Sequence, residues 1–393
     1  MNYQFSYLND EIQEHERIRN SDYTDAMIFD WVMHMVQLDN PLREIVALFW
    51  HNHVPCGKGN SHNEHSRLAL EIYRKYGLDE LSLFLKKISS TPSMLYFLDA
   101  HHSHKDNPNE NYSRELMEYF TLGRGNFSFQ DVKEASRAFT GRRFNHHKYP
   151  YELYLDEEAF DNENKNILGK IGNWNGEDVI DILLEDYNTA KHISKSALSF
   201  FVTENPPEKI INECADVYFK SGYKFIDLLK HIFFSDWFFE NSFIKSKVKT
   251  PVQLLVDFQR RVGLRCVGIK TVNYFLKSCG QKLFQPPDVS GWPSGVDWLV
   301  GSELINRVLL PSSLINISNR KFSRDTYFYK LYSRINYLDI RSFRYIADCI
   351  FDINKFYETL KKERIPVSNW MDNKDLKSEN IFRVLKHPKN QYC

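Results

Sequence analysis

The chain lacks the features that mark several large classes of protein. No apolar run approaches the roughly 18 residues that a membrane-spanning helix needs, so no membrane span is expected. The formal net charge is zero, from 51 basic and 51 acidic residues, and no block of like charge stands out. Because nonspecific binding to nucleic acid relies on a clear positive field, no nucleic-acid partner is expected.

Cysteine pairs and the common catalytic fingerprints are missing too. The six cysteines form no Cys-x-x-Cys pair, so neither thiolate-bound structural zinc nor a disulfide framework is expected. No nucleotide cradle, nucleophile elbow or dinucleotide-binding fingerprint is present. Residues 1–11 contain neither a basic nor an apolar segment, so no signal peptide is expected, and the localisation stays open.

Helical patterns dominate what the chain does contain. The 393 residues, 42% of them hydrophobic and 26% charged, have the composition of an ordinary globular protein. Apolar residues at helical spacing along most of the chain predict a predominantly α-helical protein built as a large multi-helix domain. Alternating apolar and polar residues at 149–155 predict a small β hairpin near 143–157. The Asn- and Gly-rich stretch 162–176 predicts an ordered loop. We expect a helical core over 1–317 with a small β insertion, and a C-terminal helical extension at 318–393 packed on it.

The most informative stretch is a predicted helix at 108–122. It carries Asn111, Glu115 and Glu118 at offsets of four and three, which places all three on one narrow stripe. Two carboxylates at this spacing repel each other, so we expect an arginine or a metal ion to face them. The two glutamates are candidate metal ligands, or a general acid and base whose pKa values are driven apart.

This stripe also has a purely structural interpretation. Arg114, Arg137 or Arg142 would then neutralise the two carboxylates in a buried network. Asn111 would either fix the geometry of the site through its amide or simply cap the helix. The sequence leaves both interpretations open.

A His-x-His pair lies at the end of another predicted helix. His51 and His53 precede Pro55, which argues that the helix ends here. Such a pair is a common way to present two imidazoles to zinc, copper or iron, so both are candidate metal ligands. The alternative is that one histidine caps the helix and the other packs against Trp50.

Three further segments could carry chemistry. The stretch 99–106 places three histidines near Asp99, although a solvated polar loop explains it as well. Arg142 and the acidic loop that contains Asp161 could bind an anionic or sugar-like ligand, although a solvated loop explains them as well. Trp292 and Trp298 could stack on a carbohydrate, or plug a gap between helices.

Several long motifs, in the right order, resemble the bacterial family known as domain of unknown function 1800 (DUF1800). They lie at residues 40–44 and 49–53, 94–99, 108–111, 114–118 and 120–123, 131–135 and 139–141, 176–184, 200–202, 286–293 and 388–393. The resemblance therefore covers nearly the whole chain. It implies a mostly helical fold without an established activity, and members are often exported and found alongside a sulfatase-like companion family.

The chain departs from the family pattern at two positions. Phe160 precedes Asp161 where the family usually carries His-Asp, and Arg142 stands where an aromatic residue is usual. If the missing histidine is a ligand or base in relatives, catalysis in this chain would be weakened.

Two functional hypotheses follow from these residues. The leading one is a metal-assisted hydrolase with a divalent metal ion, in which His51, His53, Glu115 and Glu118 surround the reacting centre. Asn111 and Asp161 would support it, with Arg142 and Trp292 binding the ligand. The alternative is a noncatalytic glycan- or protein-binding protein, with a glycan or the sulfatase-like companion as partner, in which the same polar residues form a structural network.

Overall fold

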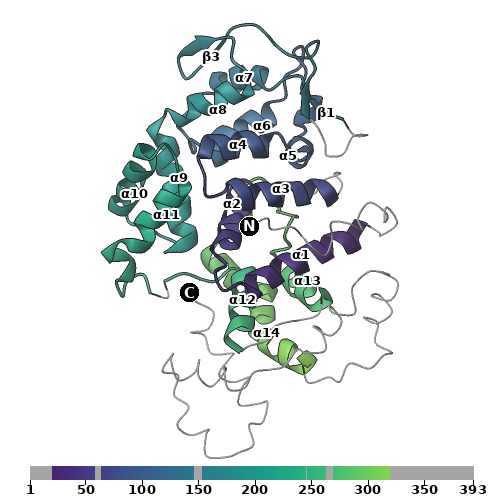
Figure 1. Cartoon of the computed structure of the whole chain (residues 1–393), viewed down its shortest axis with the longest axis vertical. Helices are drawn as coiled ribbons and strands as arrows, with labels where there is room; N and C mark the ends of the chain where they lie inside the picture. Colours follow the sequence, from purple (N-terminus) through teal and green to yellow (C-terminus); the bar gives the residue numbers. More distant parts are fainter. Residues whose placement is uncertain (1–19, 58–62, 146–152, 245, 263–268, 319–393) are drawn as a thin grey trace, which may run out of the picture. The chain divides into compact units, whose positions relative to one another are not determined.

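The computed structural model describes residues 20–57, 63–145, 153–244, 246–262 and 269–318 (Figure 1). Over these residues the chain forms 14 α-helices, short 3-10 and π-helical segments, and two antiparallel two-stranded sheets, which confirms the predominantly α-helical prediction. No helix in the described ranges is long and apolar enough to cross a membrane. The predicted C-terminal extension lies, beyond residue 318, outside the described residues.

The described residues divide into two compact units. The smaller unit comprises residues 20–39, 248–282 and 296–318, and the larger unit comprises 40–247 and 283–295. The helices of the smaller unit are α1 (Asn20–Gln37), α12 (Pro251–Val262), α13 (Ile269–Ser278) and α14 (Gly301–Ser318). Helix α1 packs on α12 and α13. Arg260 ends α1, because its Nη1 donates to the carbonyls of Met35 (2.9 Å) and Leu38 (2.7 Å).

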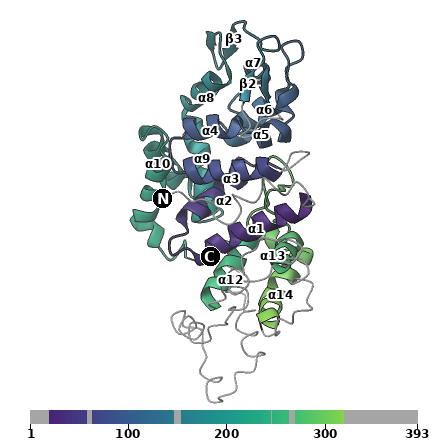
Figure 2. The same ribbon diagram turned by 45° about the vertical axis from the view of Figure 1, so that its right-hand side comes forward.

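The larger unit contains every catalytic and metal candidate predicted above, together with Arg142 and Trp292, whereas Trp298 lies in the smaller unit. Its helices are α2 (Leu42–His53), α3 (Asn63–Tyr76), α4 (Leu81–Ser89), α5 (Pro92–Phe97), α6 (Glu110–Glu115), α7 (Phe129–Ala138), α8 (Gly176–Leu184), α9 (Tyr187–Phe201), α10 (Glu208–Lys220) and α11 (Phe225–Phe234). Helices α9, α10 and α11 lie side by side (Figure 1). Helix α4 lies between α3 and α8 (Figure 2).

A cluster of aromatic side chains joins the helices of this unit. Trp50 of α2 is buried, with its ring centroid 4.5 Å from that of Phe84 in α4 and 4.8 Å from that of Phe225 in α11. Its indole N–H donates to the carbonyl of Gly77 (2.7 Å), which satisfies the one polar atom of the ring. The high aromatic content of the sequence is therefore used to fill the space between helices.

Local capping explains where α7 and α8 begin. The side chain of Ser128 accepts from the N–H of Asp131, and the Asp131 carboxylate accepts from the N–H of Ser128, so the capping box at the start of α7 is the one that the sequence predicts. Asn175 and Asp178 form the same reciprocal pair at the start of α8.

The strands agree with the sequence in one place and differ in another. Strands β1 (Arg142–Phe144) and β2 (Leu153–Leu155) pair antiparallel, which is the predicted hairpin. Strands β3 (Lys165–Ile167) and β4 (Lys170–Gly172) form a second hairpin, where we expected a loop. Its two-residue turn places Leu168 (φ 49°) and Gly169 (φ 81°) in the left-handed region. Leucine is not a typical residue at such a position, so the usual turn signal is missing.

Candidate functional site

The helix predicted at 108–122 is not one regular helix. Helix α6 ends at Glu115, and a π-helical turn, Leu116–Phe120 (η3), continues from it. A π turn takes an extra residue and is frequent at functional sites. Because the chain changes from an α-helix to a π turn after Glu115, the side chains of Glu115 and Glu118 do not have the relative directions that a regular α-helix would give them. Residue spacing alone could not reveal this change.

The end of the π turn is held by two local hydrogen bonds. The hydroxyl of Thr121 donates to the carbonyl of Leu116 (2.6 Å), and the N–H of Gly123 donates to the carbonyl of Met117 (3.0 Å). Gly123 has φ of +80°, a conformation that glycine adopts without strain. The chain therefore leaves the turn at a defined point.

Glu115 lies half-buried at the junction of α6 and the π turn. Its Oε2 is buried and has no hydrogen-bond partner among the described residues. Burial raises the pKa of Glu115, the nearby carboxylates of Glu118 and Asp288 raise it further, and Arg114 and Arg124 partly offset the effect. Glu115 is therefore a carboxyl group that holds its proton to a higher pH than an ordinary glutamate.

Glu118 is the paired member of the two carboxylates. Nε of Arg124 donates to its Oε1 (2.6 Å), and the same guanidinium also bonds the hydroxyl of Tyr119. Arg124 is thus the positive group beside the stripe, whereas the three arginines proposed from the sequence bond elsewhere. Arg114 pairs with Glu110, Arg137 with Asp161, and Arg142 with Ser90.

Asn111 does not cap the helix. The side chain of Asn109 is the cap, because its Oδ1 accepts from the N–H of Asn111 (2.8 Å). Asn111 itself is exposed on α6. Its amide can reach a ligand from solvent, but no hydrogen bond with another described residue fixes its orientation.

His51 and Asn52, two neighbouring residues of α2, bind the loop at 283–295. Nε2 of the fully buried His51 accepts from the N–H of Phe284 (3.0 Å), whose φ of 61° is unusual for a non-glycine residue. Oδ1 of Asn52 accepts from the N–H of Trp292 (3.0 Å). This loop carries Asp288, so α2 helps to place that carboxylate.

His53 faces the π turn instead. Its ring stacks on Phe49, with centroids 5.6 Å apart, and it makes a hydrogen bond with the backbone of Phe120. Nε2 of His53 is buried and has no hydrogen-bond partner in the described part of the chain. The pKa of His53 is lowered to about 3, chiefly by burial and also by the neighbouring His192, against the effect of the Phe120 hydrogen bond.

His192 of α9 is a residue that the sequence reading missed. Its Nε2 lies 2.8 Å from the carbonyl oxygen of Tyr119, and its ring centroid is 5.5 Å from that of His53. A single histidine within an amphipathic helix has no motif around it, so the sequence offers no signal for this role.

The two predicted metal ligands contact different partners. The ring of His51 lies among Tyr73, Phe284 and Trp292, whereas that of His53 lies beside Phe49 and His192. Within the ranges that the structure describes, no three side chains of His, Cys, Asp or Glu lie close enough to hold a metal ion.

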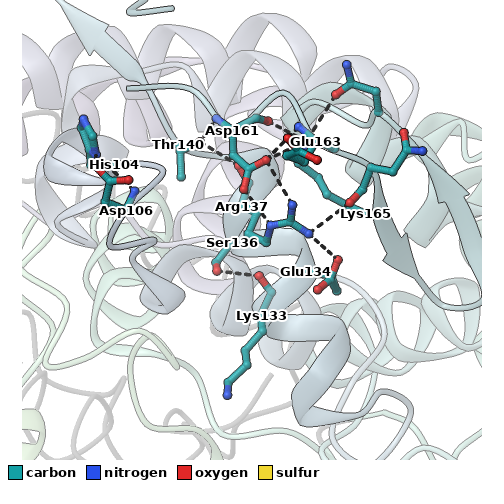
Figure 3. Close-up of polar contacts among 12 residues, drawn as sticks. His104, Asp106, Lys133, Glu134, Ser136, Arg137, Thr140, Asp161, Glu163 and Lys165 are labelled. Carbon is teal, nitrogen blue, oxygen red and sulfur yellow. Dashed lines mark hydrogen bonds and ion pairs between the residues drawn. The ribbon is translucent and has the colours of Figure 1, made fainter. Parts of the chain in front are cut away.

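Asp161 belongs to a network between α7 and β3 (Figure 3). Arg137 donates to both of its oxygens, from Nε to Oδ2 (2.7 Å) and from Nη2 to Oδ1 (3.2 Å). Burial by itself would raise the pKa of Asp161. Its hydrogen bonds with Arg137 and with the N–H of Glu163, and the charges of Arg137 and Lys165, outweigh that effect, so the pKa is lowered. Both oxygens of the Asp161 carboxylate therefore accept hydrogen bonds from neighbouring residues.

Lys165 completes this network from inside the protein. Its side chain is buried, and Nζ donates to the carbonyls of Asp161 (2.6 Å) and Glu163 (2.8 Å). The ammonium also lies 5.2 Å from the centroid of the Phe160 ring. Phe160, which stands where the resemblance implies a histidine, therefore makes a cation–π contact in this chain.

The two predicted ligand-binding residues are both engaged. Nη2 of Arg142 donates to the hydroxyl of Ser90 (2.9 Å), and its guanidinium lies 5.5 Å from the centroid of the Phe139 ring. Trp292 is only 5% exposed, with its ring 4.9 Å from that of His51. Trp298 of the smaller unit is buried as well. These indoles fill buried positions and present little surface to a ligand.

Comparison with known proteins agrees with the motifs. The family described as "Protein of unknown function (DUF1800)" matches residues 2–386. The chain belongs to the DUF1800 family. No curated protein and no solved structure matches it.

The histidine-rich segment of this DUF1800 member contains a strained residue. Asp99 is exposed and has φ of 53°, and its carbonyl accepts from the side-chain amide of Asn109 (3.1 Å). Nδ1 of His101 lies 3.1 Å from the carbonyl oxygen of Leu95. These contacts tie the segment to the chain on either side of it, including the start of α6.

His51 gives this DUF1800 member a pH-dependent stability. Burial lowers the pKa of His51 from 6.5 to about 3. The unfolded chain therefore binds a proton below pH 6.5 that the folded protein excludes. Stability from this group is present above pH 6.5 and is lost as the pH falls towards 3. Between pH 7 and 5 the loss is about 2 kcal/mol.

His51→Gln tests this, because its amide oxygen can still accept from the N–H of Phe284. We expect chemical denaturation at pH 7, 6 and 5 to show a smaller loss of stability in the variant than in the wild type. Equal losses would contradict the buried, neutral state of His51.

Proposed function

We propose that the protein is a hydrolase-type enzyme in which Glu115 is the proton-transfer group. The observation that supports this most directly is a half-buried carboxyl group whose enclosed oxygen has no hydrogen-bond partner among the described residues. A second carboxylate, Glu118, lies next to it and is paired with Arg124. Two carboxylates in unlike environments are the usual basis for dividing the acid and base roles.

The chemistry follows from the difference between the two groups. Glu115, with its raised pKa, would protonate the leaving group of the substrate. Glu118, held by Arg124, would stabilise positive charge or orient water on the reacting centre. A divalent metal ion is the cofactor expected from the sequence, and such an ion supplies an acidified water when bound. The proposed steps use the chain's own carboxylates.

Glu115→Gln is the variant that tests the proposal. The amide has the shape of the carboxyl group but cannot transfer the proton, so turnover should fall by about 100-fold. Turnover would be measured on chromogenic glycosides, esters, and phosphate and sulfate esters, with and without divalent ions. Because the acid must be protonated, the wild-type rate should fall as the pH rises through the raised pKa of Glu115.

Glu110→Gln is the matched control, because it makes the same change on the same helix in a glutamate that pairs with Arg114. It should keep its turnover. Wild-type turnover that Glu115→Gln leaves unchanged would end the proposal, and so would the absence of wild-type turnover on every substrate class.

A noncatalytic binding role is the second candidate, and the network around Asp161 favours it. There Asp161, which the sequence marked as catalytic, is bonded to Arg137 and Lys165, and the network holds β3 against α7. Thermal-shift measurements with glycans and with divalent ions separate the two candidates. A shift with a glycan alone, in a protein without turnover, would support binding to glycan or to a glycan-bearing partner such as the sulfatase-like companion.

A further inference from the structure

We propose that His192 and His53 are positioning residues that hold the π turn and, through it, the Glu115 carboxyl group. The inference rests on the proposed function of Glu115 for its catalytic meaning. The structural part of the inference does not depend on that function. Two imidazoles, one from α2 and one from α9, form hydrogen bonds with consecutive backbone groups at the end of the π turn.

First, a helix leaves its last backbone carbonyls without a hydrogen-bond partner inside the helix. Nε2 of His192 lies 2.8 Å from the carbonyl oxygen of Tyr119, and His53 makes a hydrogen bond with the backbone of Phe120. Tyr119 and Phe120 are the last two residues of the π turn. Side chains from distant parts of the sequence thus replace the backbone donors that a continuing helix would have supplied.

The second step is the protonation state of His192. A carbonyl oxygen only accepts, so the hydrogen bond with Tyr119 places the proton of the neutral ring on Nε2. Nδ1 then faces Gly123, where an added Cβ would lie 2.9 Å from it. Gly123 therefore has two roles. Its positive φ ends the π turn, and the absence of a side chain leaves room for the imidazole of His192.

The third step is the packing that orients the two rings. The ring of His53 is nearly parallel to that of Phe49, at an interplanar angle of 6°, and lies next to His192. Burial lowers the pKa of both histidines, so both rings are neutral at physiological pH and each keeps one N–H donor. The pair is thus fixed in position and in charge.

The consequence concerns the geometry of the acid site. If the donor to Tyr119 is removed, the carbonyl needs another partner, and regular α-helical bonding can supply one. That rearrangement would remove the extra residue of the π turn and change where Glu115 lies relative to Glu118 and Asp288. His192 would then act on Glu115 without touching it.

The test compares His192→Leu with His192→Gln, since the glutamine amide can still donate to the carbonyl of Tyr119. The first readout is hydrogen exchange at the N–H of Gly123, which is bonded across the turn to Met117. We expect exchange about tenfold faster in His192→Leu and close to the wild-type rate in His192→Gln. The second readout is the pKa of the Glu115 carboxyl by NMR titration, which should fall towards its ordinary value only in His192→Leu.

Ser194→Ala is the control for disturbing α9, because Ser194 is buried on the same helix and its hydroxyl has no hydrogen-bond partner among the described residues. It should leave both readouts unchanged. The same behaviour in the leucine and glutamine variants, or wild-type readouts in His192→Leu, would overturn the inference. Neither readout depends on turnover. The test of whether His192 holds the π turn therefore works even if the protein has no hydrolase activity.

Discussion

Gly291→Ala is expected to lower the free energy of unfolding by at least about 3 kcal/mol. Gly291 has φ of +84°, and an added Cβ would lie 2.9 Å from Oδ1 of Asn52 and closer still to its backbone oxygen. A flexible side chain could move aside, but the backbone of Asn52 belongs to α2 and cannot. The loop that carries Asp288 would have to detach from α2, so the hydrogen bond between Trp292 and Asn52 would be lost as well.

Gly125→Ala is the matched control for the backbone conformation. Gly125 has the same φ of +84°, but an added Cβ there meets no atom within 4 Å. Only the left-handed conformation is penalised, at about 1 kcal/mol. Urea denaturation followed by circular dichroism would measure both variants. Equal losses would mean that the approach of the loop to Asn52 is not as close as the structure shows.

Arg137→Met is expected to lower the free energy of unfolding by about 3 kcal/mol, at the lower end of the range for breaking a buried ion pair. Asp161 is 9% exposed and receives two of the hydrogen bonds of the Arg137 guanidinium, which also donates to Glu134 and to the carbonyl of Asn164. Without Arg137, the nearly buried carboxylate keeps, among the described residues, only the N–H of Glu163 and the charge of Lys165. Arg137 is itself a quarter exposed, which limits the loss.

The pH dependence of this loss gives a further check. The pKa of Asp161 is lowered in the folded protein, so its ionised form contributes stability above the unfolded pKa of about 3.9. That contribution is lost as the pH falls, and the difference between Arg137→Met and the wild type should shrink below pH 4. Arg114→Met is the control: its ion pair with Glu110 is partly exposed, at 39% and 31%, so the loss should be within about 0.5 kcal/mol at pH 7.

Local sequence signals fixed the parts of the fold that depend on near neighbours. Ser128 and Asp131 are three residues apart, so the capping box that begins α7 could be read directly. The hairpin of β1 and β2 followed from the alternation of apolar and polar residues. The hairpin of β3 and β4 could not be predicted, because Leu168 occupies a left-handed position that sequence patterns assign to glycine or asparagine.

The candidate site shows the same division. The sequence by itself determined the family and the helical class, and it singled out Glu115 and Glu118 as candidates, since these follow from residue types and short spacings. Only the tertiary structure decided that Glu115 ends a regular α-helix while Glu118 lies within a π turn, and that His192, 73 residues away from Tyr119, bonds the end of that turn. The spacing of apolar residues shows which face of a helix is buried. The choice between an α and a π turn depends on hydrogen-bond donors from elsewhere in the chain.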